Sequence, residues 1–210
     1  MNDLLKKVFA WMSIGLLVTF ATGYVVATNT NMFYSMINSY LLLAIIEIVL
    51  VIVLSARITK MSPTSARIMF LLYSFVSGLT FSSIFVVYEM SSIIYVFLIT
   101  AVVFAILAFM GYKTNIDLTK FGTYLMIALF AIIICTLINM FVGGSTFAII
   151  ICSISILVFM GFTAYDVQKI LSLQSVIEED NLAIYGALQL YLDFINLFLD
   201  ILRLFGNSKD

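Results

Sequence analysis

The fold is decided by the last long apolar segment, Ala183–Phe205, which reads AIYGALQLYLDFINLFLDILRLF. Five polar residues in it are spaced four, three, four and three apart, which at about 100° per residue places them on one stripe of a helix. They are Gln189, Asp193, Asn196, Asp200 and Arg203. Leu, Ile and Phe cover the flanking faces. Such a helix cannot turn its polar stripe toward lipid, so we expect the rest of the chain to surround it.

The composition indicates that the surrounding solvent is lipid. Of the 210 residues, 64% are hydrophobic and 10% are charged, whereas soluble domains are about half apolar and about one quarter charged. At about 20 residues per spanning helix, this length allows about six or seven spans and leaves no room for a soluble domain. The net charge of −1 and the few, scattered Lys and Arg residues argue against a nucleic-acid partner.

Seven apolar segments, separated by charges or turn-forming residues, are the expected spans. Thr28–Asn31 interrupts the uncharged region from Val8 to Ile46, and Val142–Ser145 interrupts the uncharged region from Phe121 to Tyr165. The expected helices cover residues 9–27, 35–56, 68–88, 92–112, 122–141, 147–171 and 183–205. We therefore predict a single membrane domain over residues 1–210. Its fold class is an all-α integral membrane protein, a seven-transmembrane-helix bundle with the C-terminal helix central.

Lys and Arg are distributed unequally between the two sets of connections. With the N-terminus inside, the inside segments hold eight of the ten basic residues: Lys6, Lys7, Arg57, Lys60, Arg67, Lys113, Lys120 and Lys169. The opposite connections, including the one expected over Thr28–Tyr34, contain no basic residue until Arg203 and Lys209. This asymmetry favours a cytoplasmic N-terminus in the cell membrane. A last segment that re-enters and returns would keep all ten inside, and the sequence leaves this alternative open.

Missing residue types exclude several chemistries. The chain has no His, which excludes His-ligated zinc, Ser-His-Asp hydrolysis and a His pH switch. Cys135 and Cys152 lie inside apolar runs, where a free Cys usually behaves as a small buried hydrophobe. We expect no cofactor and no enzymatic activity.

Three ionisable residues, Glu47, Asp166 and Asp193, are expected at membrane depth, where each costs about 3 kcal/mol or more. Asp193 lies about 15 Å into the last helix at about 1.5 Å per residue, near the bilayer middle. The sixth and seventh helices are joined by a short connection, so they are expected to be antiparallel neighbours in which Asp166 can approach Asp193. Two carboxylates in a poorly hydrated site cannot both ionise cheaply, so such a pair titrates as a unit.

Each of these charges also has a purely structural explanation. Asp193 can be a protonated carboxyl group that is hydrogen-bonded to a neighbour. Asp166 can pair with Lys169 one turn further on, and Asp200 can pair with Arg203 on its own helix. Glu47 can be protonated or bonded to a Ser or Thr of the third helix. The sequence alone does not choose between these explanations and a role in a pathway.

The residues around Asp193 resemble a known family. Leu190–Phe198, LYLDFINLF, is similar to the C-terminal signature of the Bax inhibitor family, the transmembrane Bax inhibitor motif-containing proteins. Shorter matches occur in the same order along nearly the whole chain: Ser77–Thr80, Asp117-Leu118, Tyr165-Asp166 and Gln168–Ile170. The chain resembles a bacterial-type member.

The resemblance implies a seven-helix bundle in which the central last helix acts as a pH-sensitive calcium leak. The family's aspartate pair corresponds to Asp166 and Asp193, which then serve as the pH sensor, the ion pathway and transient calcium ligands. A basic residue of the second helix latches onto the pair, and Arg57 is the nearest match. Arg57 can also snorkel outward to water. The implied partners are calcium ions, protons and the lipid bilayer, and Glu47 and the polar stripe support the pathway.

Two rival functions start from the same aspartates. An intramembrane aspartyl protease could use a proton-sharing pair, but that class needs Gly-x-Gly-Asp and Pro-Ala-Leu motifs. Neither occurs, and the single proline is Pro63, in a loop. A proton-coupled or other small-ion transporter remains the alternative to the calcium leak.

Overall fold

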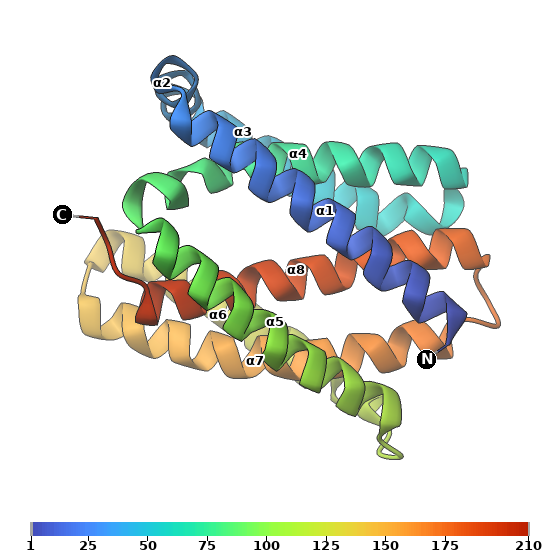
Figure 1. The fold of residues 1–210 in the computed structure, drawn as a ribbon. Coiled ribbons are helices and arrows are strands. Elements are labelled where there is room, and N and C mark those ends of the chain that lie inside the picture. The colour runs from blue at the N-terminus through green and yellow to red at the C-terminus, as the bar shows by residue number, and fades with distance from the viewer. Residues whose placement is uncertain (1, 210) are drawn as a thin grey trace. The chain divides into compact units, whose positions relative to one another are not determined.

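The computed structural model describes residues 2–209, and nearly all of them are helical (Figure 1). The helices are α1 (Asp3–Thr28), α2 (Thr30–Asn38), α3 (Tyr40–Arg57), α4 (Pro63–Val87), α5 (Met90–Lys113), α6 (Gly122–Val142), α7 (Ser145–Ser172) and α8 (Glu179–Phe205). Short 3-10 turns, η1 (Ile58–Lys60) and η2 (Leu118–Phe121), precede α4 and α6. Within the described residues, seven helical segments are long and apolar enough to cross a membrane, which confirms the predicted fold class.

The segment before α3 differs from the expectation of a loop over Thr28–Tyr34. Asn29 alone leaves the helical conformation there, and its side-chain oxygen accepts a hydrogen bond from the backbone N–H of Met32 at 3.1 Å. Asn is a strong N-cap residue, so the polar stretch starts a helix, α2, where a turn was expected. The second span expected over residues 35–56 is divided at Ser39, and α3 is its spanning part.

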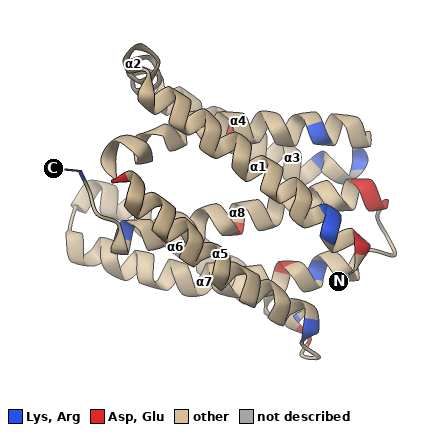
Figure 2. Ribbon diagram, in the orientation of Figure 1, with Lys and Arg blue, Asp and Glu red and all other residues tan. Residues whose placement is uncertain are grey.

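Charged residues lie mainly near the helix ends, and long stretches of each helix carry none (Figure 2). Many of the large apolar side chains of α3 and α6 are exposed. In an integral membrane protein such surfaces are covered by lipid, so their exposure here is the expected pattern.

The helices form two compact units, and α8 contributes to both. Unit 1 contains the chain up to Met90, the segment Leu173–Tyr191 and a short C-terminal piece from Ser208. Unit 2 contains Ser91–Ser172 and Leu192–Asn207. Among the spanning helices, α8 is the most buried, which agrees with its polar stripe.

Small residues bring α1 and α4 together in unit 1. The Thr19 hydroxyl oxygen lies 2.9 Å from the carbonyl oxygen of Ser74 and 2.7 Å from the hydroxyl oxygen of Tyr191 on α8. A Cβ atom at Gly78 would stand 2.8 Å from the carbonyl oxygen of Thr19. Because backbones can approach this closely only over small residues, the Gly, Ser and Thr spacing of the two helices serves their packing.

Aromatic rings and glycines pack unit 2. The Phe194 ring of α8 meets the rings of Phe97 and Phe104 on α5 edge to face, with centroids 5.3 and 5.5 Å apart. Gly111 lets α5 touch the backbone of α7 at Ala164. The second half of α8 is therefore enclosed by side chains of α5 and α7, which hold it against the rest of unit 2.

We expect Gly111→Ala to lower the thermal unfolding midpoint in detergent by several degrees. The added Cβ would overlap with the carbonyl oxygen of Ala164, a backbone atom that moves only with its helix. Overpacking of this kind costs about 1–3 kcal/mol. Gly161→Ala is the matched control, because its Cβ would meet only the end of the flexible Leu125 side chain, at 2.9 Å. Equal midpoints for the two variants would contradict the close α5–α7 contact.

Candidate functional site

The carboxyl groups of Asp166 on α7 and Asp193 on α8 lie against each other in unit 2. Each residue is only 4% exposed, and their side chains are joined by a hydrogen bond. A hydrogen bond between two carboxyl groups requires one of them to carry a proton, because an ionised carboxylate only accepts. Two buried carboxyl groups in contact are thus an arrangement in which one proton can be shared.

The surroundings of the pair give it little compensation. The Oδ2 atom of Asp193 is buried and has no hydrogen-bond partner in the described part of the chain. Lys169, one turn along α7, attracts Asp166, and its ammonium group also lies 5.4 Å from the centre of the Tyr165 ring. The charged group that acts on Asp193 is Asp166 itself. A buried oxygen without a hydrogen bond costs about 1–3 kcal/mol, so protein groups satisfy Asp193 less well than they satisfy a typical buried carboxyl group.

A second polar cluster follows along the same two helices. Asp200 on α8 accepts a short hydrogen bond from the hydroxyl of Ser155 on α7, and the Arg203 guanidinium also acts on it. Nη1 of Arg203 lies 3.5 Å from the sulfur of Cys152. Asp200 is thus satisfied by partners from both helices, unlike Asp193.

The other members of the predicted stripe have local roles. Asn196 donates a hydrogen bond to the carbonyl oxygen of Leu192, at 2.8 Å, within α8 itself. Gln189 is half-buried and belongs to unit 1, whereas the four later residues of the stripe belong to unit 2. The stripe is continuous on the helix surface, but it serves two different packing environments.

Glu47 and Arg57 lie in unit 1. Glu47 Oε2 accepts a hydrogen bond from the Thr80 hydroxyl of α4 at 3.0 Å, and Glu47 is half-buried on α3. Arg57 closes α3 and its side chain is exposed. The latch role of Arg57 and the pathway role of Glu47 stay predictions.

Sequence reasoning missed Ser155 and assigned Cys152 only to the apolar core. A usable signal was present, because Ser155 precedes Asp166 by eleven residues, about three helical turns, which puts both on one face of α7. Cys152 is free and buried, as expected, but it also touches the guanidinium of Arg203. The partner of Glu47 was present in the Ser77–Thr80 segment, whose Thr80 now has a physical role.

The donor set fits a passing cation better than a resident metal. Calcium takes six to eight oxygen ligands, and the aspartate pair supplies only part of that shell. In the part of the chain that the structure describes, no group of three or more His, Cys, Asp or Glu residues could hold a metal ion. Water and backbone carbonyl groups must complete any calcium shell at this pair.

Comparison with known proteins places the chain in a family. The family model described as "Inhibitor of apoptosis-promoting Bax1" matches residues 1–210. The chain belongs to the Bax inhibitor family. Within this family, it is 41% identical to the inner membrane protein YbhL of Escherichia coli K12 over 214 residues, which cover 98% of this chain and 92% of YbhL.

Two further bacterial relatives match over nearly their whole length. An uncharacterized protein of Borreliella burgdorferi is 40% identical and covers 100% of this chain and 94% of its own. One from Deinococcus radiodurans is 33% identical, over 98% of this chain and 90% of its own. The chain is thus similar to bacterial members of the Bax inhibitor family from end to end, and it is an integral membrane protein.

We expect Asp193→Asn to raise the thermal unfolding midpoint in detergent at about pH 9 and to change it little at about pH 5. At alkaline pH the wild-type pair loses its shared proton and two buried negative charges repel, whereas an amide can donate to Asp166.

Asp117→Asn is the control for this measurement. Asp117 is exposed in a connection, and hydrogen bonds from Thr119 lower the pKa of its carboxyl, so it stays charged over this pH range. A gain in midpoint for Asp193→Asn that is the same at both pH values would contradict proton sharing.

Proposed function

We propose that this Bax inhibitor family protein is a pH-sensitive calcium leak channel, gated by protonation of the Asp166–Asp193 pair. The observation that carries the proposal is the contact of two buried carboxyl groups on the most buried spanning helix and its neighbour. Ionisable groups at membrane depth are costly, and in membrane proteins they mark ion and proton pathways. The burial of this pair within the protein supports its assignment to such a pathway.

Protonation gives the pair two states with different consequences. Without protons, two carboxylates present hard oxygen ligands and a charge of the sign that calcium prefers. With protons, the charge is lost and the hydrogen bonds that fasten α7 to α8 change. Lys169 on α7 is the cation that opposes protonation of Asp166, so the balance depends on three titratable groups.

Arg57 and the remaining polar groups have assigned roles in this proposal. Arg57 is the latch that pairs with the aspartates in the closed state and leaves them when they are protonated. Glu47 and Asp200 provide further oxygen atoms along the route of the cation. Their hydrogen bonds to Thr80 and Ser155 fix where those oxygen atoms lie.

We further propose that the protein is not an enzyme. A proton-sharing aspartate pair also occurs in aspartyl proteases, but the Gly-x-Gly-Asp and Pro-Ala-Leu motifs of the intramembrane class do not occur in the sequence. The partners in this proposal are calcium ions, protons and the lipid bilayer. A proton-coupled or other small-ion transporter is the alternative that the same pair allows.

The proposed location is the cell membrane, with the N-terminus in the cytoplasm. Eight of the ten basic residues then lie inside, which satisfies the positive-inside rule. The Escherichia coli relative YbhL is named an inner membrane protein, which supports the cell membrane as the location.

We expect calcium flux into proteoliposomes to vary with pH, and either Asp166→Asn or Asp193→Asn to move the midpoint of that profile toward acid. Removing one carboxyl removes the neighbouring negative charge that helps the other to hold a proton, an effect of about one pH unit or more. Flux is read from a calcium dye trapped inside the vesicles while the outer pH is varied.

Asp117→Asn is the control, since this exposed carboxyl lies outside the spanning segments. An unaltered profile in both pair variants contradicts gating by the pair. Flux of other ions without any calcium flux favours the transporter alternative.

The orientation has its own test. We expect Ser208→Cys, in a background without Cys135 and Cys152, to react with a membrane-impermeant thiol reagent added outside intact cells, since seven crossings leave the C-terminus outside. Thr114→Cys, in a connection expected inside, is the control that should react only after the cells are opened. Protection of both positions in intact cells would mean that α8 returns to the inner face.

A further inference from the structure

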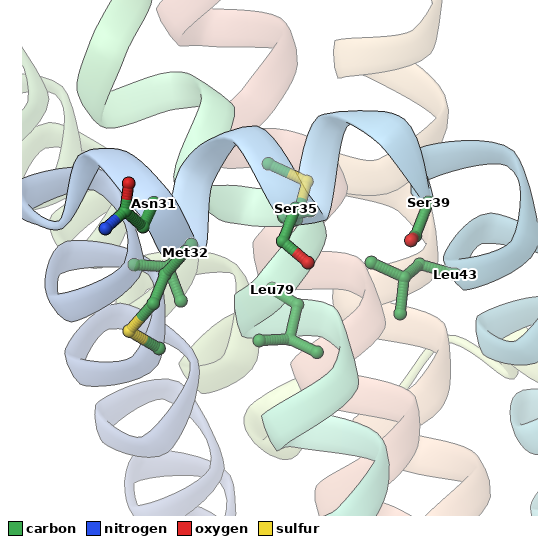
Figure 3. A pocket seen from close by; sticks show the side chains of 8 residues that line it. Asn31, Met32, Ser35, Ser39, Leu43 and Leu79 are labelled. Atoms are coloured by element: carbon green, nitrogen blue, oxygen red, sulfur yellow. The ribbon is translucent and has the colours of Figure 1, made fainter.

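A pocket of about 440 Å³ opens among α1, α2, α3 and α4 of unit 1 (Figure 3). It is lined by Val26, Asn31, Met32, Ser35, Met36, Ser39, Leu43 and Leu79. The lining has two kinds of surface. Apolar Met, Leu and Val side chains form most of it, and the two serines with Asn31 form an uncharged polar strip along α2.

The serine hydroxyls of this strip are available to a ligand. In Figure 3 the hydroxyls of Ser35 and Ser39 are directed to the side of the pocket where Leu79 and Leu43 lie. The Ser39 side chain makes no capping hydrogen bond to α3, and the Ser35 hydroxyl likewise has no partner among the side-chain hydrogen bonds of residues 2–209. Two unused donors beside an apolar cavity suit a ligand that joins acceptor oxygens to a hydrocarbon chain.

The position of α2 between two spanning helices indicates which ligand the pocket can meet. It connects the spanning helices α1 and α3, so it lies at a membrane surface whichever way the protein is oriented. No charged residue occurs from Val8 to Ile46, so the pocket wall formed by α1, α2 and the start of α3 offers no charged group that would pair with a phosphate or an ammonium group. At this depth a bilayer presents the ester groups that join glycerol to the acyl chains.

We propose that this pocket binds the glycerol-ester region and the adjoining acyl chain of one membrane phospholipid. Ser35 and Ser39 donate hydrogen bonds to the ester carbonyl oxygens, and Met32, Met36 and Leu43 enclose the chain. The volume is within the range of about 300–1,000 Å³ usual for sites that bury small ligands. Unbranched methionines adapt to a mobile chain, which suits a ligand of variable length and unsaturation.

The proposed lipid pocket adjoins the half-buried hydrogen bond between Glu47 and Thr80. Leu43 precedes Glu47 by four residues, which places the two one turn apart on the same side of α3. Leu79 precedes Thr80, the hydrogen-bond donor to Glu47. A bound lipid therefore covers the approach from the membrane surface to Glu47, and its loss uncovers that carboxyl group.

The test uses the full-length protein purified in mild detergent, stripped of lipid, and then given equal amounts of diester and diether phosphatidylethanolamine with identical chains. Native mass spectrometry counts the lipids that stay bound. We expect one retained lipid, with the diester favoured at least about fivefold, since two hydrogen bonds to ester carbonyls are absent in the diether. The double variant Ser35→Ala with Ser39→Ala should lose this preference while keeping the shape of the pocket.

The matched control is Ser153→Ala with Ser172→Ala. These two serines of α7 are also exposed, but their hydroxyls bond the carbonyl oxygens of Ile149 and Lys169 in their own helix. The control should retain the wild-type preference. Equal binding of diester and diether lipid by the wild type, or an unchanged preference in the Ser35 and Ser39 variant, overturns the proposal.

A second readout follows Glu47. A hydrophobic carbodiimide, which reacts with accessible carboxyl groups within membranes, should modify Glu47 at least about threefold faster in the lipid-stripped protein than after the diester lipid is restored. Peptide mass spectrometry gives the extent of modification. The same rate in both states contradicts the covering of Glu47. Neither measurement depends on calcium flux, so the lipid seat and the channel proposal can fail separately.

Discussion

The need to keep one polar helix face out of lipid organises this protein. A carboxyl group in hydrocarbon costs several kcal/mol unless protein or water surrounds it, and α8 carries two carboxyl groups, an amide pair and a guanidinium on one stripe. Burying that stripe requires helices on every side, so α8 is the most buried span, whereas α3 and α6 expose most of their surface. The exposed apolar surfaces of α3 and α6 can face lipid, whereas the polar stripe of α8 cannot.

The buried polar groups differ in how well they are satisfied, and the difference locates the site. Glu47 has the Thr80 hydroxyl, and Asp200 has Ser155 with Arg203 nearby. Asp193 has only another acid and an oxygen with no partner. A native protein keeps such a costly group where a function needs it, because a fully satisfied residue would be more stable. Asp193, the least satisfied of these carboxyl groups, is therefore the one on which the proposed gating rests.

The sequence was sufficient for much of this picture, because lipid leaves few choices to a chain. Uncharged runs of about 20 residues had to be spans, and the spacing of Asp193 and its neighbours had to make one face. The approach of Asp166 to Asp193 followed from the short connection between their helices. Side-chain partners chosen across helices, such as Ser155 for Asp200, depend on rotation of each helix about its axis, which the spacing within one helix does not fix.

The segment Thr28–Tyr34 shows a different limit. Its Thr and Asn residues favour turns and helix caps alike, and only the backbone decides which. In the structure Asn29 caps α2, so the segment begins a helix on which Asn31 lines a pocket wall, and it does not form a loop. Thr and Asn residues that end one helix can also begin the next, and the sequence alone did not distinguish a loop from a new helix.

The division of α8 between two units gives a physical reason for placing the acid pair where it is. The first half is fastened strongly: the Tyr191 ring packs edge to face on Tyr73, with centroids 5.8 Å apart, and Asp180 pairs with Arg67 at 2.7 Å. The second half begins beside Asp193, whose carboxyl group faces that of Asp166 on α7. The proposed gating needs an element with two states whose balance one site can bias. Under that proposal, protonation of the pair alters the α7–α8 contact and leaves the contacts of the first half of α8 unchanged.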